Sequence, residues 1–199
     1  MLINDNLYYR NPYESIVKTG HYNCKLFKKC VTSRDIKFLI FLYSTFILPK
    51  FEYASCVWSP YYKKDVDLLE DVQRKFTKFL PGFYDKSYAE RLSLLSMQTL
   101  EERRIHMDLI LVYEINHKLV DIPFDKFFEF NTSRTRGHSY KLSVKSSRVN
   151  CHKFHFFNRV VKVWNNVPER IVTLEKLNQF KSEIFKPNVK HYCIGRAFS

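Results

Sequence analysis

The apolar residues of this chain recur mainly at steps of three and four positions, the spacing that places side chains on one face of an α-helix. The clearest early run covers residues 36–48. Ser33 is expected to cap this helix, and Pro49 ends it because proline disfavours a helical conformation in the residue before it. The run contains Lys37 and is too short to span a bilayer, so we expect a core helix.

Stop and start signals delimit two further groups of helices. An amphipathic stripe covers about residues 64–80 and ends at Pro81-Gly82. Ser87-Tyr88-Ala89-Glu90 and Thr99-Leu100-Glu101-Glu102 match the capping box, in which the first and last side chains each satisfy a free backbone donor. The first box predicts a short helix, and the second predicts a longer helix that ends near Leu119.

The C-terminal part is predicted to combine helix with a little extended structure. Residues 140–144 alternate apolar and polar side chains, which is typical of a short strand or hairpin. Helical spacing returns at residues 154–165, and a last helix is expected at residues 174–185. Pro168 follows the first of these helices and marks its end.

The predicted fold class is mainly α, because only 4 glycines and 7 prolines are available for the turns that a strand-rich architecture needs. We expect a helical bundle at residues 33–120 and a basic C-terminal segment at residues 121–199. Residues 1–32 are interpreted as a poorly defined lead-in with at most loose helical turns.

The charge of the chain points to a polyanionic partner. Lys and Arg number 33 against 20 Asp and Glu, a formal net charge of +13. Self-repulsion on this scale is relieved by binding an anion, with nucleic acid the first candidate and an anionic membrane surface the second. The alternative is a basic surface with no dedicated ligand. Without a secretory signal or a spanning segment, we expect an intracellular protein, nuclear or cytoplasmic, with no membrane partner.

The strongest functional signal is a stretch without Asp or Glu, residues 130–168. Its basic side chains are candidates for neutralising phosphates, and His138 or Tyr140 for stacking on unpaired bases. The alternative is a solvated basic face in which Phe157 and Trp164 are core anchors. The candidate nucleic-acid-binding residues are Arg134, Arg136, His138, Lys141, Lys145, Arg148, Lys153 and Arg159.

Several short motifs follow one another in a recognisable order. Residues 42–60 contain Phe51-Glu52-Tyr53-Ala54-Ser55-Cys56-Val57-Trp58, and later motifs are Tyr88-Ala89-Glu90-Arg91-Leu92, Thr135-Arg136-Gly137-His138-Ser139 and the segment 156–168. This ordered set resembles the region downstream of the polymerase palm in reverse transcriptases of non-LTR (LINE-type, jockey-like) retrotransposons. The resemblance covers roughly residues 37–181.

The resemblance implies a thumb-like helical bundle that grips template and primer, followed by a basic segment. RNA, DNA or their hybrid would be the ligand, and the palm and fingers of a parent polymerase would be a further partner. Glu52, Tyr53 and Trp58 are then structural residues. We expect Glu52 to be partly buried and to pair with Arg103 or Arg104.

The chain departs from that family in its carboxylates. Polymerase palms hold two metal ions with carboxylates, but the family's Tyr/Phe-x-Asp-Asp turn is missing and no two aspartates are adjacent. The sequence before residue 37 is too short to house fingers and palm. We therefore expect no polymerisation by this chain alone, no catalytic residues and no cofactor.

No metal site is expected either. Cys24 and Cys30, and Cys151-His152 with His155, lack the cysteine pairs two to four residues apart that are typical of structural zinc, so isolated buried thiols are favoured. The acidic residues of 65–71 lie at the start of a predicted helix, where the helix dipole accounts for most of them.

The leading interpretation is a thumb-like fragment that holds nucleic acid. A protein–protein or purely structural helical module, such as a decayed transposon relic, is the alternative, and a polymerase that has lost its catalytic half is a third. A missing palm is expected to leave an apolar patch exposed on the helix at residues 36–48.

Overall fold

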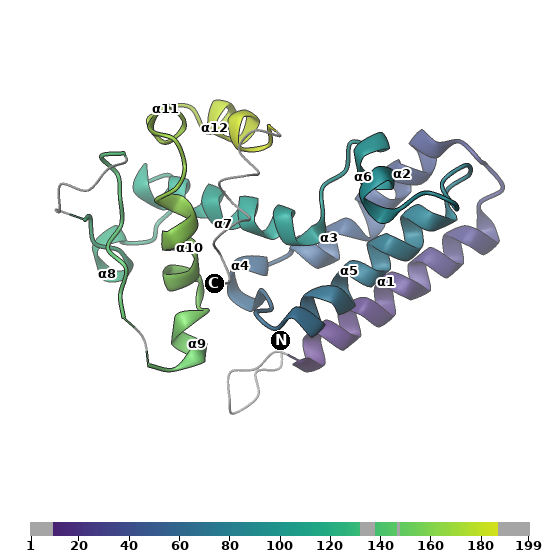
Figure 1. The fold of residues 1–199 in the computed structure, drawn as a ribbon, viewed down its shortest axis with the longest axis horizontal. Coiled ribbons are helices and arrows are strands. Elements are labelled where there is room, and N and C mark those ends of the chain that lie inside the picture. Colours follow the sequence, from purple (N-terminus) through teal and green to yellow (C-terminus); the bar gives the residue numbers. More distant parts are fainter. Residues whose placement is uncertain (1–9, 132–137, 147, 187–199) are drawn as a thin grey trace. The chain divides into compact units, whose positions relative to one another are not determined.

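The computed structural model describes residues 10–131, 138–146 and 148–186, and within these ranges the protein is mainly helical, as predicted (Figure 1). The chain divides into two compact units, residues 1–103 and 104–199. Among the described residues, no helix combines the length and the apolar character that crossing a membrane requires.

Unit 1 is a bundle of helices around an aromatic core. Its elements are α1 (Arg10–Cys30), α2 (Ile36–Phe46), α3 (Leu48–Glu52), α4 (Ser55–Trp58), α5 (Lys63–Phe79), α6 (Tyr88–Leu94) and the start of α7 (Leu100–Asn116). The sequence predicts a boundary near residue 120, after the long helix. The contacts place it inside that helix instead, so the predicted bundle of residues 33–120 is not a unit by itself.

Helix α1 corrects the expectation of a poorly defined lead-in. It is a continuous helix of 21 residues, and its buried Tyr13 hydroxyl donates a hydrogen bond of 2.8 Å to the carbonyl of Trp58. At Gly20 the helix approaches its neighbours so closely that a Cβ atom would lie 2.9 Å from the Phe51 ring and 3.0 Å from Val72. Glycine is unfavourable within helices, and here close packing against α3 and α5 offsets its low propensity.

Helix α2 is buried on one face only. Tyr43 is fully buried and stacks on Phe76 of α5, with ring centroids 4.4 Å apart. Phe38 and Phe41 are exposed, so the apolar patch expected on this helix is present and the helix is not wholly a core element. Its N-cap is Asp35, whose side chain accepts a hydrogen bond from the Lys37 amide, and not the predicted Ser33.

A network of buried polar groups joins α5, α6 and the start of α7. Gln73 lies at its centre: its side-chain oxygen accepts a 2.9 Å hydrogen bond from the Tyr43 hydroxyl, and its nitrogen donates to the Tyr88 hydroxyl at 3.1 Å. The Glu70 carboxylate accepts a hydrogen bond from the same Tyr88 hydroxyl and a second, of 3.0 Å, from the backbone amide of Leu100. Each buried polar atom in this chain of contacts therefore has a partner.

Both predicted capping boxes form. At α6 the Glu90 carboxylate accepts a 2.7 Å hydrogen bond from the Ser87 amide, and the Ser87 hydroxyl accepts one from the Glu90 amide. The same reciprocal pair links Thr99 and Glu102 at the start of α7. Between α5 and α6, Gly82 adopts a positive φ of 78°, a backbone conformation that glycine adopts readily. This conformation explains why α5 stops here.

Unit 2 packs short helices along the remainder of α7. They are α8 (Phe124–Phe127), α9 (Asn150–Lys153), α10 (Phe156–Trp164), α11 (Glu169–Val172) and α12 (Leu177–Ile184). Tyr113 of α7 is the centre of the contacts: its ring stacks on Phe180 at 4.3 Å, and its hydroxyl donates to the carbonyl of Leu174 at 2.6 Å. The same Phe180 ring lies 6.2 Å from Trp164 of α10.

Among the residues that the structure describes, the strand predicted at residues 140–144 is reduced to a single antiparallel bridge between Phe130 and Leu142. The side chain of Asn165 takes the place of a neighbouring strand. Its Oδ1 atom accepts a hydrogen bond from the backbone N–H of Leu142, and its Nδ2 atom donates one to the backbone carbonyl of Leu142, both at 2.8 Å. These two bonds satisfy the backbone groups that a longer sheet would pair, and the segment needs no further strand.

We predict that Glu70→Ala lowers the free energy of unfolding of unit 1 by about 2–4 kcal/mol, because it leaves the buried Leu100 amide and Tyr88 hydroxyl without an acceptor. Equilibrium urea denaturation measures this change. Asp85→Ala, at an exposed acid of the same unit, is the matched control. Equal effects of the two substitutions would show that the network contributes nothing particular to stability.

Candidate nucleic-acid interface

Of the eight predicted contact residues of unit 2, the six that the structure describes do not form one exposed surface. Arg134 and Arg136 lie outside the described residues. Arg148 and Lys153 are exposed, and Lys141 is partly buried. Lys145 is exposed but forms a 2.9 Å ion pair with Glu129, which lies just before the stretch that lacks acids.

His138 is removed from the predicted set because its ring is buried. Only 4% of the residue is exposed, and its Nε2 lies 3.0 Å from the carbonyl oxygen of Trp164. Burial lowers the pKa of His138, which disfavours the protonated ring that could bind a phosphate. The ring also meets the Trp164 indole edge-on, so His138 holds a loop on α10 and is closed to a nucleobase.

Arg159 is also removed, since its guanidinium is used inside unit 2. Its Nε and one terminal nitrogen donate to the two carboxylate oxygens of Asp108, at 2.8 and 2.9 Å. A further nitrogen donates to the carbonyl of Phe154. The basic stretch itself holds no opposite charge for Arg159, but Asp108 of α7 is 51 positions away in sequence and adjacent in space.

The residues predicted to be structural have different environments. The Glu52 carboxylate pairs with Arg103, one of the two partners expected. Trp58 and Trp164 are buried, and Phe157 stacks on Phe127 at 4.1 Å. Tyr53 differs from the expectation: 81% of the residue is exposed, because its side chain projects from the turn between α3 and α4.

The thiols and the acidic cluster provide no metal site among the described residues. Cys24 is partly buried, and burial raises the pKa of its thiol to about 12; Cys30, by contrast, is exposed, against the prediction of buried thiols. In the acidic cluster, Asp67 pairs with Arg74 at 3.1 Å, so its members form specific contacts beyond the helix dipole.

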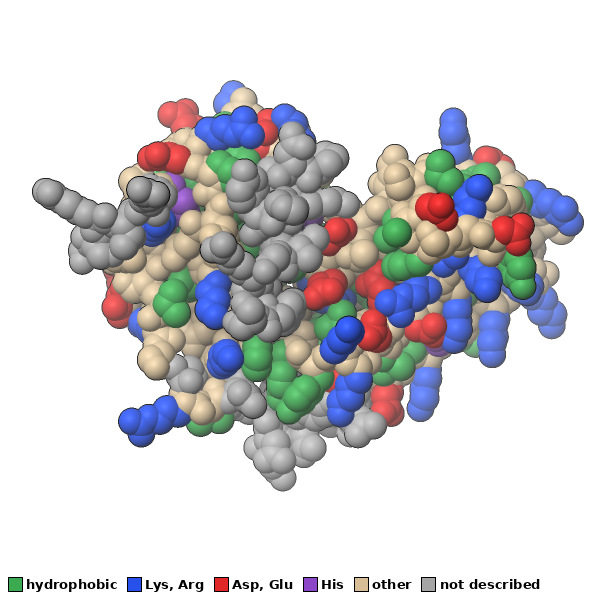
Figure 2. All heavy atoms as spheres, viewed as in Figure 1, with side chains coloured by type: hydrophobic (Ala, Val, Ile, Leu, Met, Phe, Trp, Pro, Cys, Tyr) green, Lys and Arg blue, Asp and Glu red, His purple; other side chains and the backbone are tan. Residues whose placement is uncertain are grey.

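A basic surface that the sequence analysis missed lies on unit 1, where α1 and α5 run side by side in the same direction. Figure 2 shows many Lys and Arg side chains over these two helices, with several Asp and Glu side chains among them. We define the α1–α5 basic surface by its exposed lysines, which are Lys18, Lys25, Lys28, Lys29, Lys75 and Lys78.

Helical spacing brings the four lysines of α1 together. Lys18, Lys25 and Lys29 are separated by seven and four positions, so they lie on one side of the helix, and Lys28 lies beside them toward α5. Its ammonium group is 5.6 Å from the centre of the Phe79 ring. The only acid of α1 is Glu14, which precedes all four lysines, and residues 15–34 contain no Asp or Glu.

The Asp71 carboxylate lies at the junction of the two helices. Asp71 forms a 2.6 Å ion pair with Lys75 and lies 3.3 Å from the Nε2 atom of His21. Burial and then the positive charge of Lys75 lower the pKa of His21, while Asp71 raises it. Lys25 lowers the pKa of the same ring, which places the cations of α1 and α5 within one electrostatic neighbourhood.

The signal for this surface was available in the sequence. The stretch 15–34 lacks acidic residues just as 130–168 does, but it is shorter and lies in a segment whose sequence predicts at most loose helical turns. Unless this segment is helical, its four lysines do not lie on a common face. No protein-family model matches the chain, and no curated protein or solved structure shows significant similarity to it.

We predict that Arg159→Met lowers the free energy of unfolding of unit 2 by about 3–5 kcal/mol, because it removes the two charge-assisted hydrogen bonds that Arg159 donates to the buried Asp108 carboxylate. Lys162→Met is the matched control, since Lys162 is exposed on the same helix. Adding Asp108→Leu to Arg159→Met should recover part of the loss. Unchanged thermal and urea unfolding of Arg159→Met would return this residue to the candidate interface.

The Glu52–Arg103 pair gives a further prediction for unit 1. Glu52→Gln removes the charge from a partly buried, hydrogen-bonded ion pair, so the free energy of unfolding should fall by about 1 kcal/mol. Thermal unfolding followed by circular dichroism would show a lower melting temperature. Glu90→Gln, at a fully exposed capping residue, should have a smaller effect, and an unchanged melting temperature for Glu52→Gln would contradict a structural role.

Proposed function

We propose that this chain holds nucleic acid and does so without catalysing polymerisation, as a fragment similar to the thumb and post-thumb region of a non-LTR reverse transcriptase. The observation that carries the proposal is the α1–α5 basic surface, with six exposed lysines, of which Lys75 is paired with Asp71. The ordered motifs of residues 37–181 support the family interpretation.

The arrangement of the lysines suits a phosphate backbone. Their long stems are held along two parallel helices, and a strand that crosses both helices would meet several ammonium groups at once. Lysine acts here as a point charge and gives no base readout. The ligand we propose is therefore a duplex, such as an RNA–DNA hybrid, bound through its phosphates with little sequence preference.

A second candidate function is a protein–protein module. The exposed Phe38 and Phe41 of α2 favour it, because exposed aromatic side chains in neighbouring turns of a helix are typical of contact surfaces. The two candidates differ in their response to salt. Phosphate contacts weaken steeply as salt rises, whereas apolar contacts do not.

We predict salt-sensitive binding of a short RNA–DNA hybrid by the full chain, measured by fluorescence anisotropy. If about six phosphates are contacted, affinity should fall by about 10³-fold between 50 and 200 mM salt. Combined Lys25→Glu, Lys28→Glu and Lys78→Glu should weaken binding by about 100-fold and reduce the slope of log affinity against log salt by about three.

The control variants distinguish binding by unit 1 from binding by unit 2, and a local effect of the lysines from an effect of the total charge. Lys37→Glu, Lys86→Glu and Lys126→Glu change the net charge equally at exposed lysines elsewhere and should weaken binding much less. Arg148→Glu with Lys153→Glu tests the remaining exposed residues of unit 2. Absence of binding at low salt by a folded sample would overturn the proposal, and so would equal losses in the two triple variants.

A further inference from the structure

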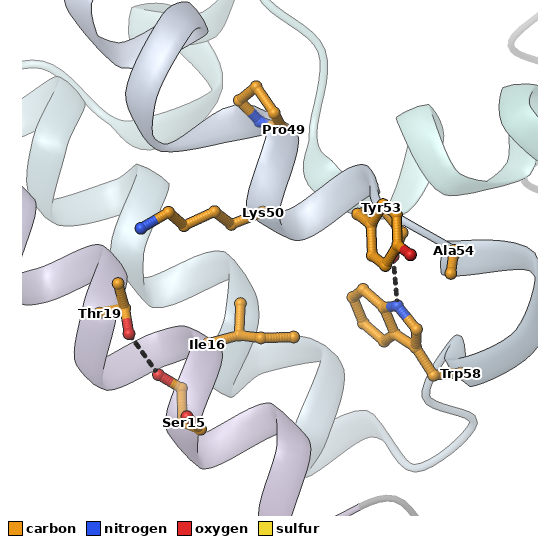
Figure 3. Close-up of a pocket in the computed structure, with 8 residues that line it drawn as sticks. All are labelled: Ser15, Ile16, Thr19, Pro49, Lys50, Tyr53, Ala54 and Trp58. Atoms are coloured by element: carbon orange, nitrogen blue, oxygen red, sulfur yellow. Dashed lines mark hydrogen bonds between the residues drawn. The ribbon is translucent and has the colours of Figure 1, made fainter. Parts of the chain in front are cut away.

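A pocket of about 470 Å³ opens on unit 1, on a different side of α1 from its lysines (Figure 3). Three short stretches of the chain form it: Ser15, Ile16 and Thr19 of α1, Pro49 and Lys50 of α3, and Tyr53, Ala54 and Trp58 around α4. Figure 3 shows the two large aromatic side chains at one end, the Lys50 ammonium group and Thr19 at the other, and Ile16 between them.

The aromatic end is rigid on one side and open on the other. Trp58 is buried, and its indole nitrogen donates a 2.6 Å hydrogen bond to the carbonyl of Tyr53. Ala54 adopts a positive φ of 53°, a sparsely populated conformation that turns the chain sharply between these two residues. The Tyr53 ring is largely solvent-exposed, so a flat ligand can cover it.

The polar end carries a cation and two hydroxyl groups. Lys50 is exposed and forms no ion pair with another described residue, since the acid nearest in sequence, Glu52, is paired with Arg103. The Thr19 hydroxyl donates to the carbonyl of Ser15 at 3.0 Å, which leaves its lone pairs free to accept a hydrogen bond. This end therefore offers a positive charge and hydrogen-bonding groups, while the walls between the ends are apolar.

We propose that this pocket takes one unpaired nucleotide of the bound nucleic acid, with the base on the Tyr53 ring and the phosphate beside Lys50. The inference rests on the proposed function, because a polyanion bound to the chain supplies the nucleotide. It goes further by assigning a base-binding site on a different side of α1. A flat π-face, an apolar wall and a cation in that order match base, sugar and phosphate. Where the duplex held on the lysines ends, one nucleic-acid strand can continue alone. This single-stranded part would reach the side of α1 on which the pocket opens.

The test compares three ligands on the full chain: a blunt RNA–DNA hybrid, the hybrid with a four-adenosine overhang, and the hybrid with a four-residue abasic overhang. The abasic overhang has the same phosphates and no bases. The adenosine overhang should bind about 10-fold tighter than the abasic one, because one of its bases stacks on an aromatic side chain and an abasic residue cannot.

Substitutions test whether the Tyr53 ring causes the tighter binding of the adenosine overhang. Tyr53→Ala should abolish the difference between the two overhangs, and Tyr53→Phe should keep it, because stacking needs the ring and not the hydroxyl. Tyr22→Ala is the matched control at another exposed tyrosine, on α1, and should also keep it. A 5-iodouridine in the overhang should photo-cross-link to a peptide that contains Tyr53 or Trp58.

The outcomes separate this inference from the proposed function. Binding of the blunt hybrid with equal affinities for the two overhangs would overturn the pocket assignment and leave the proposed function standing; a pocket that takes an apolar side chain of a protein would give this result. A base-dependent gain that survives Tyr53→Ala would also overturn it. Failure of all three ligands to bind would contradict both.

Discussion

The close approach of α1 to α3 and α5 at Gly20 is the constraint on which the candidate sites depend. A side chain at this position would displace the Phe51 ring and Val72, so only glycine lets the helix lie this deep. The same approach orients α1, with its lysines toward one flank and Ser15 and Thr19 toward the other. One buried contact thus positions both the basic surface and the pocket.

Buried charges in this protein serve the fold, and exposed charges remain for binding. Glu70 fixes the first amide of α7 from within a network of hydroxyl and amide groups, and Arg159 fixes Asp108 through two parallel hydrogen bonds. Such groups cannot leave their partners without a large desolvation cost. The lysines of α1 form no ion pair with another residue that the structure describes, so a phosphate backbone can bind them without breaking the core.

The helical character, the capping boxes and the stop after α5 could be predicted, because they depend on local periodicity and on residues with strong backbone preferences. Helix α1 could not, since its stability comes from packing against α3 and α5 and not from its own propensity. The roles of Arg159 and His138 could not be predicted for a related reason. Arg159 pairs with Asp108 and His138 contacts the carbonyl of Trp164, and both partners are distant in sequence. Charge patterns locate basic residues, whereas only the fold tells which remain exposed.

The central claim is that nucleic acid lies on the lysines of α1 and α5. Lysine acetylation footprinting, with and without a bound RNA–DNA hybrid at low salt, tests it most directly. The account predicts protection of the lysines of the α1–α5 basic surface, Lys25 and Lys28 above all, while Lys37 and Lys86 stay reactive. Uniform protection, or protection confined to residues 104–199, would contradict it.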